Sequence, residues 1–157
     1  MKILKKILLV LLILGIAIQF YRPEKNLAQG EHTLPFLTET NPPNEVRTLL
    51  KTACYDCHSN HTNYPWYNNI APISFWLQDH IKEGKEELNF SDWAQYSNKR
   101  KDHKLEELIE EVSENEMPLA EYTWTHKEAV LDREQIDAIV RWAKKTRVLY
   151  QLGKQPN

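Results

Sequence analysis

The only two cysteines of the chain lie in the pentapeptide Cys54-Tyr55-Asp56-Cys57-His58, and this pattern leaves few folds open. Two cysteines separated by two residues and followed at once by a histidine form the attachment signature of a c-type haem. The spacing places both sulfurs on one side of a helical turn, within reach of the two haem vinyl groups, while His58 projects its imidazole at the iron. The motif therefore predicts one covalent haem c on Cys54 and Cys57, with His58 as an axial ligand.

A second axial ligand has to come from the opposite wall of the haem pocket. Met117 is the only methionine besides the initiator, and it precedes Pro118, which ends helical pairing and holds the thioether in a loop. Sulfur favours Fe(II), so ligation by His58 and Met117 would raise the reduction potential and suit electron transfer. Besides an open sixth position, the competing candidates are His61, His80, His103 and His126.

Apolar residues recur with a helical period in four segments of the body, and no segment alternates with period two. Asp132 with Gln135 resembles a capping box at the start of the last segment, and Gly84 is expected to end the second. The helices are expected at about 43–54, 71–83, 101–114 and 132–149. The sequence therefore predicts an all-α domain.

Two irregular stretches between these helices, 63–69 and 120–126, are rich in aromatic residues. Such loops usually cover something apolar, and excluding water from a haem raises its potential. The alternative for each of these residues is an ordinary aromatic core. The residues expected nearest the macrocycle are Trp66, Tyr67, Ile70, Trp76, Trp93, Leu105, Ile109, Leu119 and Trp124.

An apolar run occupies residues 7–20 and follows the lysines Lys2, Lys5 and Lys6. This is the pattern of a secretory signal or an N-terminal membrane anchor. No small-x-small cleavage signature follows the run, which favours a retained anchor. We therefore expect residues 1–21 to anchor the chain in the inner membrane of a bacterium, with the lysines in the cytoplasm and the haem domain in the periplasm.

The segment 22–41 contains Pro23 and Pro35 and has neither helical nor strand periodicity, so it is expected to be a flexible linker. The haem-binding domain is then expected over 42–150, followed by a tail, 151–157.

The charge balance limits the possible partners. The chain has 20 basic and 22 acidic residues and a formal net charge of -2. A near-neutral chain lacks the electrostatic footprint of a nucleic-acid-binding protein. We expect redox proteins and the membrane as partners instead.

Longer stretches of the sequence resemble the small bacterial haem-binding domain proteins, the Haem_bd family, which are relatives of monohaem class I c-type cytochromes. The resemblance covers about Asn41 to Val148 and is carried by CYDCHSN, TNYPWYNNIAPISFWLQDHIKEGKEELNFSDW and EMP. It implies covalent haem on Cys54 and Cys57 with His58 axial, and a cytochrome c-like helical fold in which the first and last helices pack together. It also matches Met117 to the distal methionine of class I cytochromes.

Two other uses of the cysteines compete with haem. A zinc site would need the adjacent Cys57 and His58 in one tetrahedron, which the chain can hardly provide. A redox dithiol is expected in a βαβ setting, which is missing. Within the haem interpretation we expect a non-enzymatic single-electron carrier. The alternative is a haem-based peroxidase or a gas or redox sensor with an open or displaceable sixth ligand.

Overall fold

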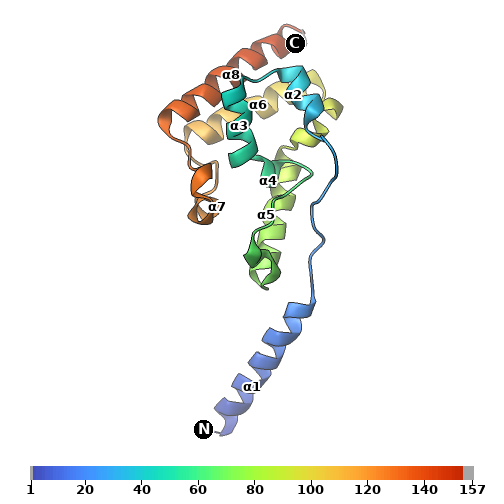
Figure 1. The fold of residues 1–157 in the computed structure, drawn as a ribbon, viewed down its shortest axis with the longest axis vertical. Helices are drawn as coiled ribbons and strands as arrows, with labels where there is room; N and C mark the ends of the chain where they lie inside the picture. The colour runs from blue at the N-terminus through green and yellow to red at the C-terminus, as the bar shows by residue number, and fades with distance from the viewer. Residues whose placement is uncertain (1, 154–157) are drawn as a thin grey trace.

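A single apolar helix stands below a bundle of helices in the computed structural model, which describes residues 2–153 (Figure 1). Among these residues there is no strand, only one isolated bridge between Leu27 and His61, so the all-α prediction is confirmed. The elements are α1 (Lys2–Ala17), η1 (Ile18–Phe20), α2 (Leu34–Thr40), α3 (Asn44–Ala53), α4 (Tyr55–His58), η2 (Trp66–Asn69), α5 (Ile73–Glu87), η3 (Phe90–Gln95), α6 (Asn98–Ser113), α7 (Ala120–Thr125), η4 (Lys127–Ala129) and α8 (Arg133–Gln151).

The four helices predicted from periodicity are α3, α5, α6 and α8. The capping box at the start of α8 is also confirmed, because Gln135 N donates to Asp132 Oδ1 and Asp132 N donates to Gln135 Oε1, both at 2.9 Å. As the resemblance implies, α3 packs against α8. The predicted tail lies largely outside the described residues, since α8 extends to Gln151 and residues 154–157 are not described.

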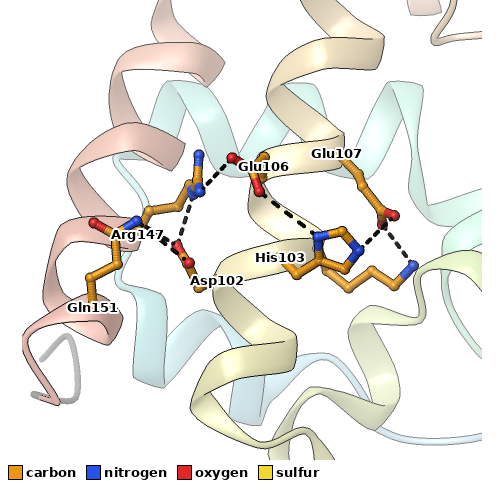
Figure 2. A network of polar contacts seen from close by, with 7 residues as sticks. Asp102, His103, Glu106, Glu107, Arg147 and Gln151 are labelled. Carbon is orange, nitrogen blue, oxygen red and sulfur yellow. Dashed lines mark hydrogen bonds and ion pairs between the residues drawn. The ribbon is translucent and has the colours of Figure 1, made fainter.

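The helices α6 and α8 lie side by side at the top of the bundle (Figure 1). Their facing sides supply apolar residues such as Leu105 and Ile139, which are fully buried. On the outer side, Arg147 of α8 contacts Asp102 Oδ1 and Glu106 Oε1 of α6, each at 2.8 Å (Figure 2). The two helices are therefore held together by buried apolar residues between them and by ion pairs on their outer side.

The centre of the core is an aromatic cluster around Phe36, whose side chain is 0% exposed. Its ring centroid lies 4.6 Å from that of Phe90, 5.1 Å from Trp93 and 6.0 Å from Trp142. Aromatic pairs at such distances add to the free energy gained by burying the rings. The cluster joins α2, η3 and α8 into one body.

The position of Phe36 corrects the prediction of a flexible linker over 22–41. The end of that segment is α2, which belongs to the core. The sequence analysis counted Pro35 among the signs of a linker, but Pro35 lies in the first turn of α2, where a missing N–H costs no hydrogen bond.

The middle of the same segment is strapped to the domain. Ala28 N donates to Asn60 O and Thr62 N donates to Asn26 O, both at 2.9 Å, around the bridge between Leu27 and His61. Further along, His32 Nδ1 lies 2.9 Å from Ser91 Oγ. Residues 26–32, which we call the strap, therefore run along the loop that follows the Cys-x-x-Cys-His motif.

Replacing Phe36 with alanine is expected to lower the free energy of unfolding by about 3–5 kcal/mol, because a buried aromatic side chain is lost and a cavity remains. Guanidinium titration of the purified protein followed by circular dichroism measures this change. Leu34→Ala is the matched control, since Leu34 is on the same helix but 49% exposed. Equal losses for the two variants would contradict the placement of α2 in the core.

The helix α1 and the turn η1 form a continuous apolar segment, Lys2–Phe20, with a mean hydropathy of 2.4 and no residue buried inside the domain. Its length and composition suffice to cross a membrane, and an N-terminal signal sequence has the same character.

Candidate haem site

The structure brings Cys54, Cys57, His58 and Met117 together on the wall of one cavity of about 450 Å³. This volume falls within the range of about 300–1,000 Å³ that is usual for cofactor and ligand sites. Most of the remaining wall is apolar, which suits a flat, largely hydrophobic group. The apolar lining residues are Ala53, Leu88, Phe90, Leu108, Val112, Pro118 and Leu119.

The cysteine motif forms a separate turn of helix. α3 ends at Ala53, and the single turn α4 follows, with Cys57 N and His58 N both donating to Cys54 O at 3.2 and 2.9 Å. This turn sets the two cysteines three residues apart on one side of the backbone, as the sequence predicts. Neither thiol is bonded to the other.

Burial raises the pKa of both cysteine thiols to about 12. Cysteines that act in disulfide exchange have lowered pKa values, because the thiolate is the reactive species. The surroundings of Cys54 and Cys57 therefore argue against a redox dithiol. Among residues 2–153, no group of three or more histidine, cysteine, aspartate or glutamate side chains is placed so that it could hold a metal ion.

His58 is held in one orientation by a backbone carbonyl. Its Nδ1 lies 2.9 Å from Leu88 O, and because a carbonyl can only accept, Nδ1 carries the proton. Burial lowers the pKa of His58, so the ring is neutral and the lone pair is on Nε2. A neutral imidazole whose other nitrogen donates to a carbonyl is the usual state of a metal-ligating histidine.

The helix α5 comes unusually close to this motif at Gly84. A Cβ at Gly84 would lie 3.0 Å from Cys57 O and 3.1 Å from Cys57 Cβ. The prediction that Gly84 ends the helix is wrong, since α5 continues to Glu87. This glycine allows two backbones to approach each other, and the three further residues bring Leu88 O to His58.

Gly84→Val is expected to lower the free energy of unfolding by about 1–3 kcal/mol, because the added side chain collides with the backbone of Cys57. The haem content per protein is expected to fall as well. Thermal unfolding and absorbance measure the two effects. Gly15→Val is the control, since nothing lies within 4 Å of a Cβ at Gly15. An unchanged melting temperature for Gly84→Val would contradict the close approach.

Met117 enters the cavity from the segment between α6 and α7. Asn115 adopts a left-handed conformation with φ 60°, and Glu116 N and Met117 N then both donate to Glu111 O, at 2.9 and 3.1 Å. This hydrogen-bonded turn fixes the backbone of Met117.

One competing histidine also lines the cavity. His80 stands on α5, donates Nδ1–H to Trp76 O at 2.9 Å and rests on the Trp76 ring. The others do not line it: His61 bonds Ala28 O, His103 faces two glutamates on the outside of α6 (Figure 2), and His126 stacks on Tyr122. His80 stands on α5, which packs against α4, whereas Met117 comes from the segment between α6 and α7.

Most of the aromatic residues expected around the haem are elsewhere. None of Trp66, Tyr67, Ile70 and Trp76 lines the cavity, and Trp66 is 78% exposed. Trp93 and Leu105 are in the core, Ile109 packs against that core, Trp124 is exposed, and only Leu119 is part of the wall. The stretch 63–69 lies instead toward the end of α1. Its aromatic residues therefore indicate an apolar environment other than the haem cavity.

The sequence interpretation missed Tyr122 and Phe90. Tyr122 Oη donates to Asp56 Oδ2 at 2.9 Å, which ties α7, just after Met117, to the cysteine motif. Phe90 reaches the cavity from η3, with its ring centroid 6.5 Å from that of His58. Leu108 and Val112 could have been found, because they share the predicted apolar face of α6.

A charged cluster occupies another part of the wall. Lys104 is buried, and its Nζ lies 2.6 Å from Glu107 Oε2 and 3.4 Å from Glu87 Oε2. Burial acts to lower the pKa of Lys104, but the two carboxylates outweigh it and raise that pKa. Among the described residues, Lys104 is the only lysine or arginine in the lining, and with Glu83, Glu87, Glu107 and Glu111 beside it the charged part of the wall is net acidic.

The donor set fits an iron porphyrin. Two unpaired thiols lie on one helical turn, a neutral imidazole presents Nε2, and a thioether lies on another segment of the same wall. Imidazole and thioether sulfur are both established iron ligands in haem proteins.

Comparison with known proteins agrees with this site. Residues 13–145 match the sequence profile of the family described as haem-binding domain. No curated protein and no solved structure matches the chain. The matched range covers most of the chain and includes both cysteines, His58 and Met117, so the chain belongs to the haem-binding domain family.

Proposed function

We propose that the chain carries one haem c, attached through Cys54 and Cys57 and ligated by His58 and Met117, and that it transfers single electrons. The observation that carries the proposal is the hydrogen bond from His58 Nδ1 to Leu88 O. It leaves Nε2 free as a ligand beside two thiols on the same cavity wall.

The chain's own residues would tune such a site in three ways. The Leu88 carbonyl makes the His58 ring more basic and fixes its direction. The Met117 thioether favours the reduced state of the metal. The apolar walls disfavour extra positive charge. When bound, the haem supplies the one-electron change between Fe(III) and Fe(II). The thioether and the apolar part of the wall favour a raised reduction potential, whereas the more basic His58 ring and the glutamates in the wall act in the opposite direction.

A second function, that of a peroxidase or a sensor, is favoured by the ionisable side chains in the same wall. His80 and Glu83 line the cavity and are groups that can move protons. This function needs a sixth position that is open or that Met117 vacates readily. Binding of CO or cyanide to the native protein separates the two proposals, because a carrier with firmly bound Met117 binds both slowly.

The location completes the proposal. We infer that α1 is retained as an anchor in the inner membrane, with the haem domain in the periplasm, where haem c attachment takes place. The lysines at the start of α1 support this orientation. Redox proteins are the proposed partners.

The proposal is tested on the full chain produced in a bacterium that attaches haem c. Protein whose pigment resists acidic acetone and gives the pyridine haemochrome spectrum of haem c is expected. A weak ferric charge-transfer band in the far red is expected as the mark of His/Met ligation. Colourless protein, or pigment that acidic acetone extracts, would contradict covalent attachment.

A further inference from the structure

An exposed apolar patch lies at the end of the domain nearest α1. It consists of Trp66, Ile70, Ile73 and Trp76, which are 78%, 40%, 40% and 43% exposed. Trp66 is in η2, and Ile73 and Trp76 are one turn apart on α5. The haem cavity uses none of the four, so the proposed function gives no reason for so much exposed apolar surface.

Four contacts attach this part of the domain to the end of the apolar N-terminal helix. Gln19 Nε2 donates to Ala71 O at 3.1 Å, and Ala71 N donates to Gln19 Oε1 at 3.0 Å. The rings of Tyr21 and Phe75 lie 5.6 Å apart between centroids. Arg22 Nη1 donates to Asn69 O. These contacts therefore hold the patch close to the C-terminal end of α1, at the same height along the axis of that helix.

The length of the apolar segment determines where the end of α1, and with it the patch, would lie relative to a bilayer. The segment Lys2–Phe20 has 19 residues, which extend about 28 Å as a helix and nearly match a hydrocarbon core of about 30 Å. If it crosses the membrane, its end with Phe20 and Tyr21 reaches the surface of the bilayer. Figure 1 shows the start of α5 and η2, in green, as the part of the bundle closest to that end.

The composition of the patch suits this position. Tryptophan and tyrosine are enriched where the hydrocarbon meets the headgroups, because their rings are apolar at one end and polar at the other. Phe20 and Tyr21, which are 84% and 68% exposed, extend the apolar surface toward α1.

We infer that Trp66, Ile70, Ile73 and Trp76 insert into the interfacial layer of the same bilayer that α1 crosses. The domain then lies against the membrane in one orientation. This inference rests on the proposed retention of α1 as an anchor, and it does not depend on the haem.

The test is photo-crosslinking of the full chain in vesicles of phosphatidylcholine and phosphatidylglycerol. The photoreactive amino acid p-benzoylphenylalanine is placed at Trp66, at Trp76 or, as a control, at Val148. Val148 is 51% exposed and belongs to the C-terminal end of α8, and Figure 1 shows this end of the helix on the opposite side of the domain from α1. Mass spectrometry is expected to find at least about tenfold more lipid adduct at the first two positions than at Val148.

A second variant tests the patch as a unit. With the probe at Trp76, the pair Trp66→Asp and Ile73→Asp is expected to reduce the lipid adduct several-fold, whereas Val148→Asp leaves it unchanged. Circular dichroism verifies that each variant is folded.

Flotation with the vesicles and the intact mass report on the anchor in the same samples, and the pyridine haemochrome spectrum reports on the haem. A chain that floats with α1 intact but gives lipid adducts only at the level of Val148, or crosslinks to protein instead, overturns the inference while the anchor stands. A chain that has lost α1 and stays in solution overturns both.

Discussion

A chain with both Cys54→Ala and Cys57→Ala is expected to carry no covalent haem and to lose the fixed packing around the cavity. The cavity measures about 450 Å³, and the usual cost of about 24 cal/mol per Å³ gives an upper limit of about 11 kcal/mol for leaving it empty. This is as large as the whole free energy of unfolding of an ordinary domain, about 5–15 kcal/mol. The helices α6 and α8 pack through residues outside the cavity as well, so helical structure is expected to remain.

The expected state therefore keeps much of its far-ultraviolet circular dichroism, loses its near-ultraviolet signal and binds the dye ANS. The control is the unchanged sequence produced without haem attachment. It should show the same loss of fixed packing, because the missing cofactor and not the two missing side chains causes that loss. A double variant with native near-ultraviolet signal would show that the cavity does not depend on the cofactor.

Met117→Ala is expected to lower the reduction potential by at least about 59 mV, a tenfold change in the equilibrium constant of a one-electron couple. The loss of the thioether removes the ligand that favours Fe(II) and leaves the sixth position open. Redox titration measures the potential, and rapid binding of CO measures the opening. The far-red ferric band should disappear.

His80→Ala is the matched variant, because His80 is the other candidate ligand that lines the cavity. It is expected to leave the potential and the far-red band unchanged. The opposite result, with Met117→Ala silent and His80→Ala altering the spectrum, would assign the sixth position to His80.

The sequence predicted a helix correctly wherever the capping residues and the apolar periodicity of that helix lay within the helix itself. The capping box of α8 and the periodicity of α3, α5, α6 and α8 depend on residues a few positions apart, and the structure has all of them. The end of α5 was misplaced, because a glycine usually favours a helix end. At Gly84 the reason for the glycine is a contact with Cys57, 27 positions earlier in the chain, and no local rule reveals such a contact.

The candidate site, like the fold, was predictable only where its residues lie close together in the sequence. Cys54, Cys57 and His58 share one helical turn, so their proximity follows from spacing alone. The aromatic stretch was placed wrongly, because its composition indicates an apolar environment without saying which one. Phe36 was missed for a similar reason: a single aromatic residue in a short, proline-containing segment shows no periodicity, and only tertiary packing makes it central.

The strap along residues 59–62 limits how far the domain can move. A dozen disordered residues would span about 20 Å on average and let a tethered domain sweep through that distance. With residues 26–32 fastened down, a domain anchored through α1 gives up this reach. Such a domain cannot move away from the membrane surface to reach a distant electron donor or acceptor. If the chain transfers electrons as proposed, its redox partner would have to reach the domain, either by diffusing within the membrane or from solution.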